Sequence, residues 1–208
     1  MLALASNETL IVVAAYDDLY SHLTDQLEGR GGPVHRVSTA DGGYQTQAII
    51  DTYRFGPKHD SYLFLQDSLE PLVDDVVRPF REKQRSAKAR SGMWPEVVAW
   101  GAFPMFFDSD QQKAWVGRQF PVLPPVGFFG PVFFAERKAL DYLERFNLWP
   151  RVPRDKEQAQ GTERSWAAAF FAAGVPFTAL GGIEREAPDS PRVVPTDRTF
   201  RKVFGGRQ

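Results

Sequence analysis

The stretch Ser61-Tyr-Leu-Phe-Leu-Gln-Asp-Ser-Leu-Glu70 decides the fold class of this chain. Tyr62 to Leu65 form a short, continuous apolar run, and polar residues and Pro71 bound it. Such a run is typical of a strand buried on both faces, as in the parallel sheets of α/β proteins. Asp67 follows at the carboxyl end, where open α/β sheets bind ligands, so we predict that it holds a metal ion or a substrate hydroxyl. The alternative is a turn-capping role before Pro71.

Strands and helices alternate ahead of this stretch. Apolar, β-branched residues predict a first strand at 9–15, and a second is expected at 33–38. Leucines four residues apart predict a helix at 19–27, and a further helix is expected from Tyr44 to the breaker Gly56-Pro57. The order strand, helix, strand, helix, strand implies a parallel sheet with right-handed crossovers.

The second half continues the pattern less regularly. The expected elements are a surface helix at 72–89 interrupted at Pro79, a strand at 95–103, a helix at 136–146, a loop at 149–161, an alanine-rich helix at 162–173 and a strand at 175–180. We therefore predict an α/β fold for residues 1–208: a single domain whose mostly parallel, Rossmann-like sheet is flanked by helices.

The composition excludes several classes of function. With 25 Lys and Arg against 26 Asp and Glu, the net charge of -1 demands no anionic polymer as a partner. The absence of cysteine excludes thiolate nucleophiles and thiolate metal sites. Neither a signal sequence nor an apolar run near the ~18 residues of a membrane span is present, so a cytoplasmic protein without a membrane partner is expected.

Known nucleotide-binding and hydrolase motifs are also absent. The turn after the first strand, Ala14-Ala-Tyr-Asp-Asp18, has no Gly-x-Gly-x-x-Gly, and neither a Walker A sequence nor a Gly-x-Ser-x-Gly occurs. The three histidines lack the paired spacing of metal ligands. A hard oxygen ligand such as Asp67 suits Mg²⁺ or Mn²⁺, which could offset the charge of a nucleoside diphosphate leaving group.

The order of these features resembles the glycosyltransferases of the GT-A fold. The similarity is carried by Asp41-Gly-Gly-Tyr-Gln-Thr-Gln-Ala48, Leu65-Gln-Asp67, Gly127-Phe-Phe-Gly130 and Thr162-Glu-Arg164. It implies transfer of a sugar from a nucleotide-sugar donor to a hydroxyl acceptor, with the donor half at about 1–108 and the acceptor half and C-terminal tail at about 109–208. Asp67 matches the first acid of the family's DXD metal motif, although Asp67-Ser-Leu69 lacks the second. A divalent metal, Mn²⁺ or Mg²⁺, is implied by that match.

The donor site is expected where the predicted strand and turn ends converge. The residues assigned to it are Ala15, Tyr16, Asp41, Gly42, Gly43, Gln45 and Asp67. The tail residues Arg201, Lys202 and Arg207 are expected to close over the diphosphate, with a solvated basic tail as the alternative. On this interpretation, removal of residues 200–208 lowers diphosphate affinity and spares the fold.

Two acids are candidates for catalysis. Glu163, near the expected start of the alanine-rich helix, is assigned as the base that deprotonates the acceptor in an inverting transfer. A structural role at the positive end of the helix dipole is the alternative. Asp108, in an aromatic-rich loop, is the second candidate.

Two questions of function stay open from the sequence. A looser similarity to small phage-type transferases that glycosylate modified DNA bases adds a hydroxymethylated base, and hence nucleic acid, to the acceptors that the resemblance implies. The same strand and helix order also suits a nucleotide- or phosphate-binding α/β module without transferase activity.

Overall fold

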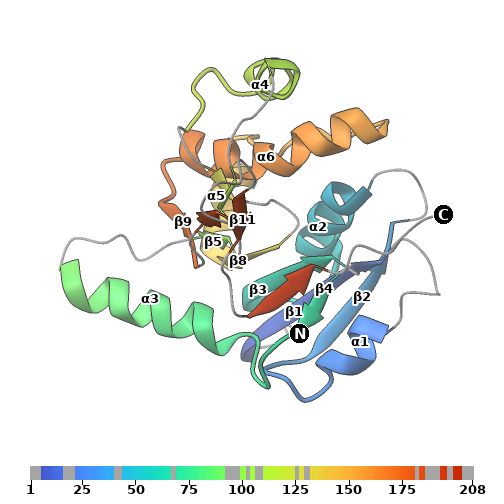
Figure 1. Cartoon of the computed structure of the whole chain (residues 1–208), viewed down its shortest axis with the longest axis vertical. Helices are drawn as coiled ribbons and strands as arrows, with labels where there is room; N and C mark the ends of the chain where they lie inside the picture. The colour runs from blue at the N-terminus through green and yellow to red at the C-terminus, as the bar shows by residue number, and fades with distance from the viewer. Residues whose placement is uncertain are drawn as a thin grey trace.

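The computed structural model describes residues 6–15, 22–39, 44–66, 69–91, 99–101, 104–105, 110–124, 127–128, 132–180, 183–185, 193–195 and 199–202. Its centre is a six-stranded sheet of order β2-β1-β3-β8-β5-β9 (Figure 1). The α/β class and the mostly parallel sheet between helices, both predicted from the sequence, are confirmed.

The first three strands form a parallel half-sheet. β1 (Ser6–Ala15) lies between β2 (Val34–Ser38) and β3 (His59–Gln66), and both pairings are parallel. Ala15 is in register with Ser38 and Ala14 with Gln66, so the three strands end at one edge. The apolar run of β3 is buried along 62–65, as predicted from its sequence.

The other half of the sheet contains one reversed strand. β8 (Phe133–Glu136) pairs antiparallel with β3 and with β5 (Ala99–Gly101), and β5 pairs parallel with β9 (Phe177–Ala179). Two reversals restore the direction, so β5 and β9 run the same way as β1, β2 and β3. The carboxyl ends of five strands therefore lie at one edge of the sheet.

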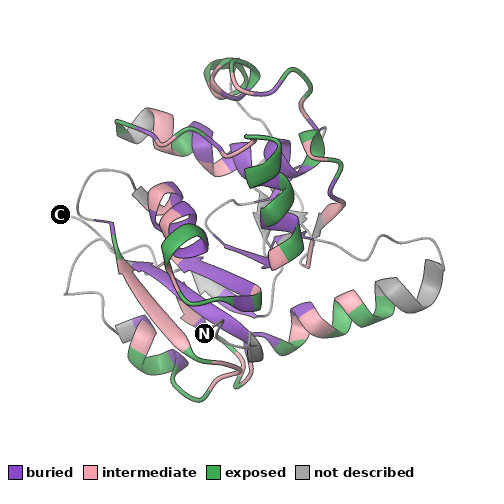
Figure 2. Ribbon diagram, turned by 180° about the vertical axis from the view of Figure 1, so that it is seen from behind, coloured by how far each residue is buried: buried purple, intermediate pink, exposed green. Residues whose placement is uncertain are grey.

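Alternating side chains divide the core between the two faces of the sheet, because successive residues of a strand point to opposite sides. Leu10, Val12 and Phe64 belong to the apolar cluster that includes residues of α2, α5 and α6, whereas Ile11 and Val13 belong to the cluster with residues of α1 and α3. Figure 1 shows these two groups of helices on opposite sides of the sheet. In Figure 2, β1 and β3 are buried and the edge strand β2 is partly buried.

The helices that flank the sheet are α1 (His22–Leu27), α2 (Tyr44–Phe55), α3 (Arg78–Ser91), α4 (Asp110–Gly117), α5 (Arg137–Arg145) and α6 (Lys156–Ala172). No helix in these described ranges combines the length and the apolar character that crossing a membrane requires.

The predicted helix at 72–89 was wrong in its first part. Asp75 Oδ1 accepts hydrogen bonds from the backbone N–H groups of Val77 and Arg78, so the helix begins at Arg78. Pro79 lies in the first turn, where a missing N–H costs nothing, and therefore starts the helix instead of interrupting it. Val76 is buried in the non-helical segment before it, which explains the misleading apolar pattern.

Three two-stranded ribbons complete the described structure. They are β4 (Leu69–Pro71) with β12 (Phe200–Lys202), β6 (Pro104–Met105) with β7 (Gly127–Phe128), and β10 (Ile183–Arg185) with β11 (Val193–Pro195). Phe200 is 1% exposed and belongs to the core cluster that contains Leu65 and Leu69. The expectation that residues 200–208 can be removed without harm to the fold is therefore wrong.

Candidate functional site

The carboxyl edge of the main sheet is the candidate site. The last residues of its five co-directional strands are Ala15, Ser38, Gln66, Gly101 and Ala179. The crevice outside this edge is where open α/β sheets hold ligands. Ala15, predicted to contact the donor, does lie at this edge, at the end of β1, the middle strand of the parallel half-sheet.

Helix α2 adds an electrostatic feature to this edge. It begins at Tyr44, six residues after the last residue of β2, and runs back along the sheet to Phe55 before β3. The first N–H groups of a helix lack intrahelical partners and carry partial positive charge, which favours phosphate groups. Gln45, a predicted donor residue, is in this first turn and is half-buried.

The C-terminal segment reaches the same part of the sheet through β12. In its antiparallel pairing with β4, Arg201 is in register with Glu70 and Lys202 with Leu69. β4 starts at Leu69, two residues after Asp67 in the chain. The backbone of the two basic residues is therefore paired to the strand that follows the predicted metal ligand.

Several predicted site residues fall outside the described ranges. They are Tyr16, Asp41, Gly42, Gly43, Asp67, Asp108 and Arg207. Within the described ranges, no three His, Asp or Glu side chains group in a way that could hold a metal ion. The described residues thus provide no ligand set for the predicted Mn²⁺ or Mg²⁺.

Glu163 lies in the middle of α6, and its predicted place near the helix start is wrong. The helix begins at Lys156, capped by Asp155, whose side chain accepts a hydrogen bond of 2.8 Å from the backbone N–H of Gln158. The dipole effect fades within the first turn, so it gives no reason for a carboxylate at Glu163. The side chain is half-buried, next to the buried Arg164. Asp108, the other predicted catalytic acid, lies outside the described ranges.

A polar network that the sequence did not indicate ties α2 to α5. Tyr53 donates a hydrogen bond of 2.6 Å to Asp141, and the guanidinium of Arg137 lies 5.1 Å from the Tyr53 ring centroid and donates to Tyr62 at 2.9 Å. Burial, followed by the bond to Asp141, raises the pKa of Tyr53 well above its ordinary value. Because Tyr62 belongs to the first half of β3, away from its carboxyl end, we interpret the network as structural.

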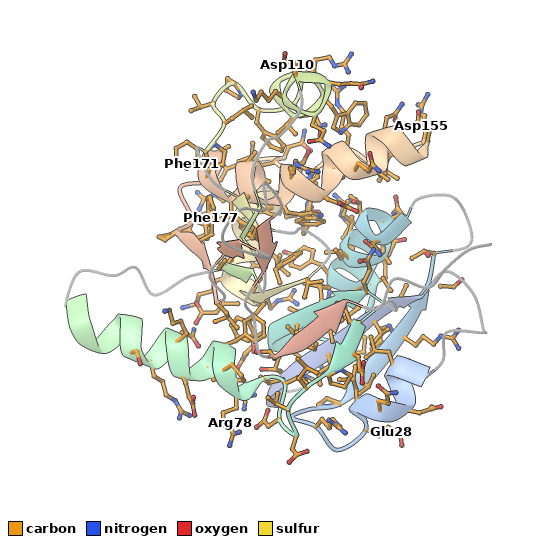
Figure 3. The ribbon with its side chains drawn as sticks, viewed as in Figure 1. Glu28, Arg78, Asp110, Asp155, Phe171 and Phe177 are labelled. Carbon is orange, nitrogen blue, oxygen red and sulfur yellow. The ribbon has the colours of Figure 1, made fainter. Side chains whose placement is uncertain are left out.

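A second feature missed by the sequence interpretation is a pocket of about 370 Å³ between α4 and the first half of α6. Its lining comes from the two helices, from Arg118 directly after α4 and from the cap residue Asp155. Figure 3 labels Asp155 and Asp110 at the beginnings of these helices. The predicted loop at 149–161 supplies three lining residues, which are Asp155, Gln158 and Gln160. None of these lining residues is a strand end.

Comparison with known proteins gives remote structural similarity and no match in sequence. No protein-family model matches the chain, and no curated protein matches it in sequence. Among solved structures it is similar to the catalytic domain of Drosophila beta1,4-galactosyltransferase 7 in complex with xylobiose, at 12% identity and a TM-score of 0.47, over 96% of this chain and 72% of that chain.

A mutant of the same enzyme, in complex with manganese, UDP-Gal and xylobiose, is similar at 12% identity and a TM-score of 0.43, over 95% of this chain and 71% of that chain. Similarity of this degree concerns the arrangement of helices and strands, and it does not extend to ligands or residues.

Proposed function

We propose that this chain is a glycosyltransferase that binds a nucleotide-sugar donor at the carboxyl edge of the sheet and transfers the sugar to a hydroxyl acceptor. The observation that carries the proposal is the convergence of five strand ends with the first turn of α2. A diphosphate at this edge would meet the positive end of the α2 dipole. Arg201 and Lys202 lie in β12, which pairs with β4, and they are the proposed source of further positive charge.

The donor contacts proposed at this edge include Ala15, Gln45 and Asp67, with Tyr16 and the Asp41-Gly-Gly43 turn beside them. Asp67 follows Gln66, the last residue of β3, and its carboxylate is the proposed contact with a divalent metal or with the donor's hydroxyls. A hydroxymethylated DNA base remains one proposed acceptor.

In the proposed reaction the acceptor hydroxyl oxygen bonds to the anomeric carbon as the bond from that carbon to the diphosphate oxygen breaks. The acceptor proton passes to the carboxylate of Glu163, and the electron pair of the broken bond leaves on the diphosphate. Glu163 is the proposed base, with Asp108 as the second candidate. Because Glu163 lies in the middle of α6, the helix dipole does not account for a carboxylate at this position, and the proposed role as base is the one to be tested.

Donor binding is tested by thermal unfolding with UDP, GDP and ADP and with their glucose and galactose conjugates, each with and without Mn²⁺. A ligand at 100 times its dissociation constant stabilises the fold by about 2.7 kcal/mol. For a chain of this size that corresponds to a melting shift of about 5–10 °C. Asp67→Asn should reduce the donor-induced melting shift more with Mn²⁺ than without it. An equal reduction in both conditions would indicate that Asp67 contacts the sugar or the ribose. If no nucleotide shifts the melting temperature of the wild type, the proposed donor site is excluded.

The base is tested by single-turnover transfer with Glu163→Gln, which keeps the size and hydrogen bonding of the side chain. Transfer should fall by about 10²–10⁴ while the donor-induced melting shift is unchanged. Glu82→Gln, on the exposed face of α3, removes the same charge far from the site and is the matched control. Transfer near the wild-type rate by the Glu163 variant would move the search to Asp108.

The second candidate function is a nucleotide- or phosphate-binding module without transferase activity. The same edge and the same helix terminus favour it, since both need only bind a phosphate. It predicts a melting shift that is as large with free diphosphates as with nucleotide sugars. It also predicts no transfer to any acceptor, including an oligonucleotide that contains hydroxymethylcytosine.

A further inference from the structure

The pocket between α4 and α6 carries an inference that does not depend on the proposed transfer. Its volume of about 370 Å³ lies at the lower end of the range of small-molecule sites, ~300–1,000 Å³. Such sites are usually mostly apolar, whereas this one is lined by Gln111, Gln112, Trp115, Arg118, Asp155, Gln158 and Gln160. A wall with four amides and one aromatic ring calls for a ligand that has many hydroxyl groups and some apolar surface.

Trp115 is a fixed ring in this wall. Its indole N–H donates a hydrogen bond of 3.0 Å to the hydroxyl of Thr162, and the Arg118 guanidinium lies 5.6 Å from its ring centroid. Gly161 lets the ring approach α6, because a Cβ atom there would lie 2.6 Å from Trp115 Cδ1. A pyranose that packs its apolar C–H face on this ring takes the place of the exposed Arg118 guanidinium, while the ring itself loses little side-chain entropy.

The amide groups supply the polar half of such a site. The side chains of Gln111 and Gln160 are exposed and make no hydrogen bond to the described residues. Gln158 Oε1 accepts a bond of 3.0 Å from the backbone N–H of Arg154, which orients the amide and leaves its NH₂ group as a donor. An amide both donates and accepts, so it can pair with two neighbouring hydroxyls of a sugar ring.

The charges of the pocket favour a neutral ligand. Among the described residues of the lining, Arg118 and Asp155 are charged, one of each sign. Asp155 also offsets the positive end of the α6 dipole, because its carboxylate accepts the N–H of Gln158 as the helix cap. The first turn of a helix usually attracts a phosphate group, but here the carboxylate of Asp155 occupies that position and would repel one.

We propose that the pocket between α4 and α6 is a binding site for a neutral sugar of one or two rings, with Trp115 as the stacking surface and the glutamines as hydrogen-bonding groups. The site is distinct from the carboxyl edge and binds its sugar without the donor.

The experiment follows the indole N–H resonance of Trp115 in ¹H–¹⁵N NMR spectra of the full chain, assigned with Trp115→Phe. Maltose, cellobiose and lactose are titrated without nucleotide, and glucose 6-phosphate and UDP serve as charged competitors. At least one neutral disaccharide should shift the resonance saturably. Gln111→Ala combined with Gln160→Ala should raise its dissociation constant about tenfold or more. Gln26→Ala, an exposed glutamine on α1, is the matched control and should leave the dissociation constant unchanged.

The proposal is overturned if no neutral disaccharide shifts the resonance at millimolar concentration. It is also overturned if the double variant binds as the wild type does, or if glucose 6-phosphate or UDP binds more tightly than the neutral sugars. Both glutamine side chains are exposed, so the double variant should melt with the wild type, and a change in binding then reports on the pocket. The titrations contain no nucleotide-sugar donor. A negative result would therefore not contradict the proposed transferase activity, and a positive result would not support it.

Discussion

Phe200 tests whether the C-terminal segment is part of the core. Its ring is 1% exposed and shares an apolar cluster with Leu65, Leu69 and Val76. Phe200→Ala deletes the ring and leaves a cavity, for which buried phenylalanines typically cost ~3–5 kcal/mol. Since a domain is stabilised by only ~5–15 kcal/mol, we expect this one substitution to remove a large share of the free energy of unfolding.

The measurement is thermal unfolding followed by circular dichroism. At about 2–4 °C per kcal/mol for a chain of this length, Phe200→Ala should lower the melting temperature by ~6–20 °C. Phe55→Ala is the matched control, because that side chain is 82% exposed at the end of α2 and its loss should cost less than ~0.5 kcal/mol. A shift of less than ~3 °C for Phe200→Ala, or equal shifts for the two variants, would refute the packing of β12 against the sheet.

Two further predictions concern packing and pH. Gly161→Ala should destabilise the fold by ~1–3 kcal/mol, because the added methyl group overpacks against Trp115, and the higher helix propensity of alanine should offset ~1 kcal/mol of this loss. Gly117→Ala is the control, because its added methyl group meets no atom within 4 Å and should not destabilise the fold. Urea unfolding of both variants measures the difference, and equal changes in the free energy of unfolding would contradict the prediction. Because burial raises the pKa of Tyr53, the unfolded chain releases its phenolic proton first, and stability falls as pH rises above ~10. Tyr53→Phe removes the titrating group, together with its hydrogen bond to Asp141. Between pH 10 and 11, the free energy of unfolding of this variant should therefore fall less steeply than that of the wild type, by up to ~1.4 kcal/mol per pH unit. An unchanged slope would exclude Tyr53 as the source of the pH dependence.

The first half of the fold could be predicted because its signals are local. The apolar run at 62–65 and the β-branched run of β1 are long enough to bury both faces of a strand, and Gly56 follows the end of α2 at Phe55. The direction of β8 could not be predicted, since an apolar run of four residues has the same pattern in a parallel and an antiparallel pairing. Its direction is set by contacts with β3 and β5, which lie far away in the sequence.

The start of α6 was missed although its signal is present in the sequence. Asp155 and Gln158 have the spacing of a helix cap, and both side chains do accept backbone hydrogen bonds. Gly161 was interpreted as the end of a loop, but it lies inside the helix, where Trp115 packs directly against it. That contact joins residues distant in the chain, so the pocket between α4 and α6 could not be inferred from the sequence. The placement of Asp67 remains a prediction.

The reversed strand β8 has a consequence for how the chain folds during synthesis. β3 pairs with β1 on one side and β8 on the other, but β8 follows β3 by more than sixty residues. At ~5–20 residues per second, β3 emerges several seconds before its second neighbour and offers an unpaired, apolar edge. Any chaperone or premature association that acts on the nascent chain should therefore act at Tyr62–Leu65, in the interval before Phe133 is made.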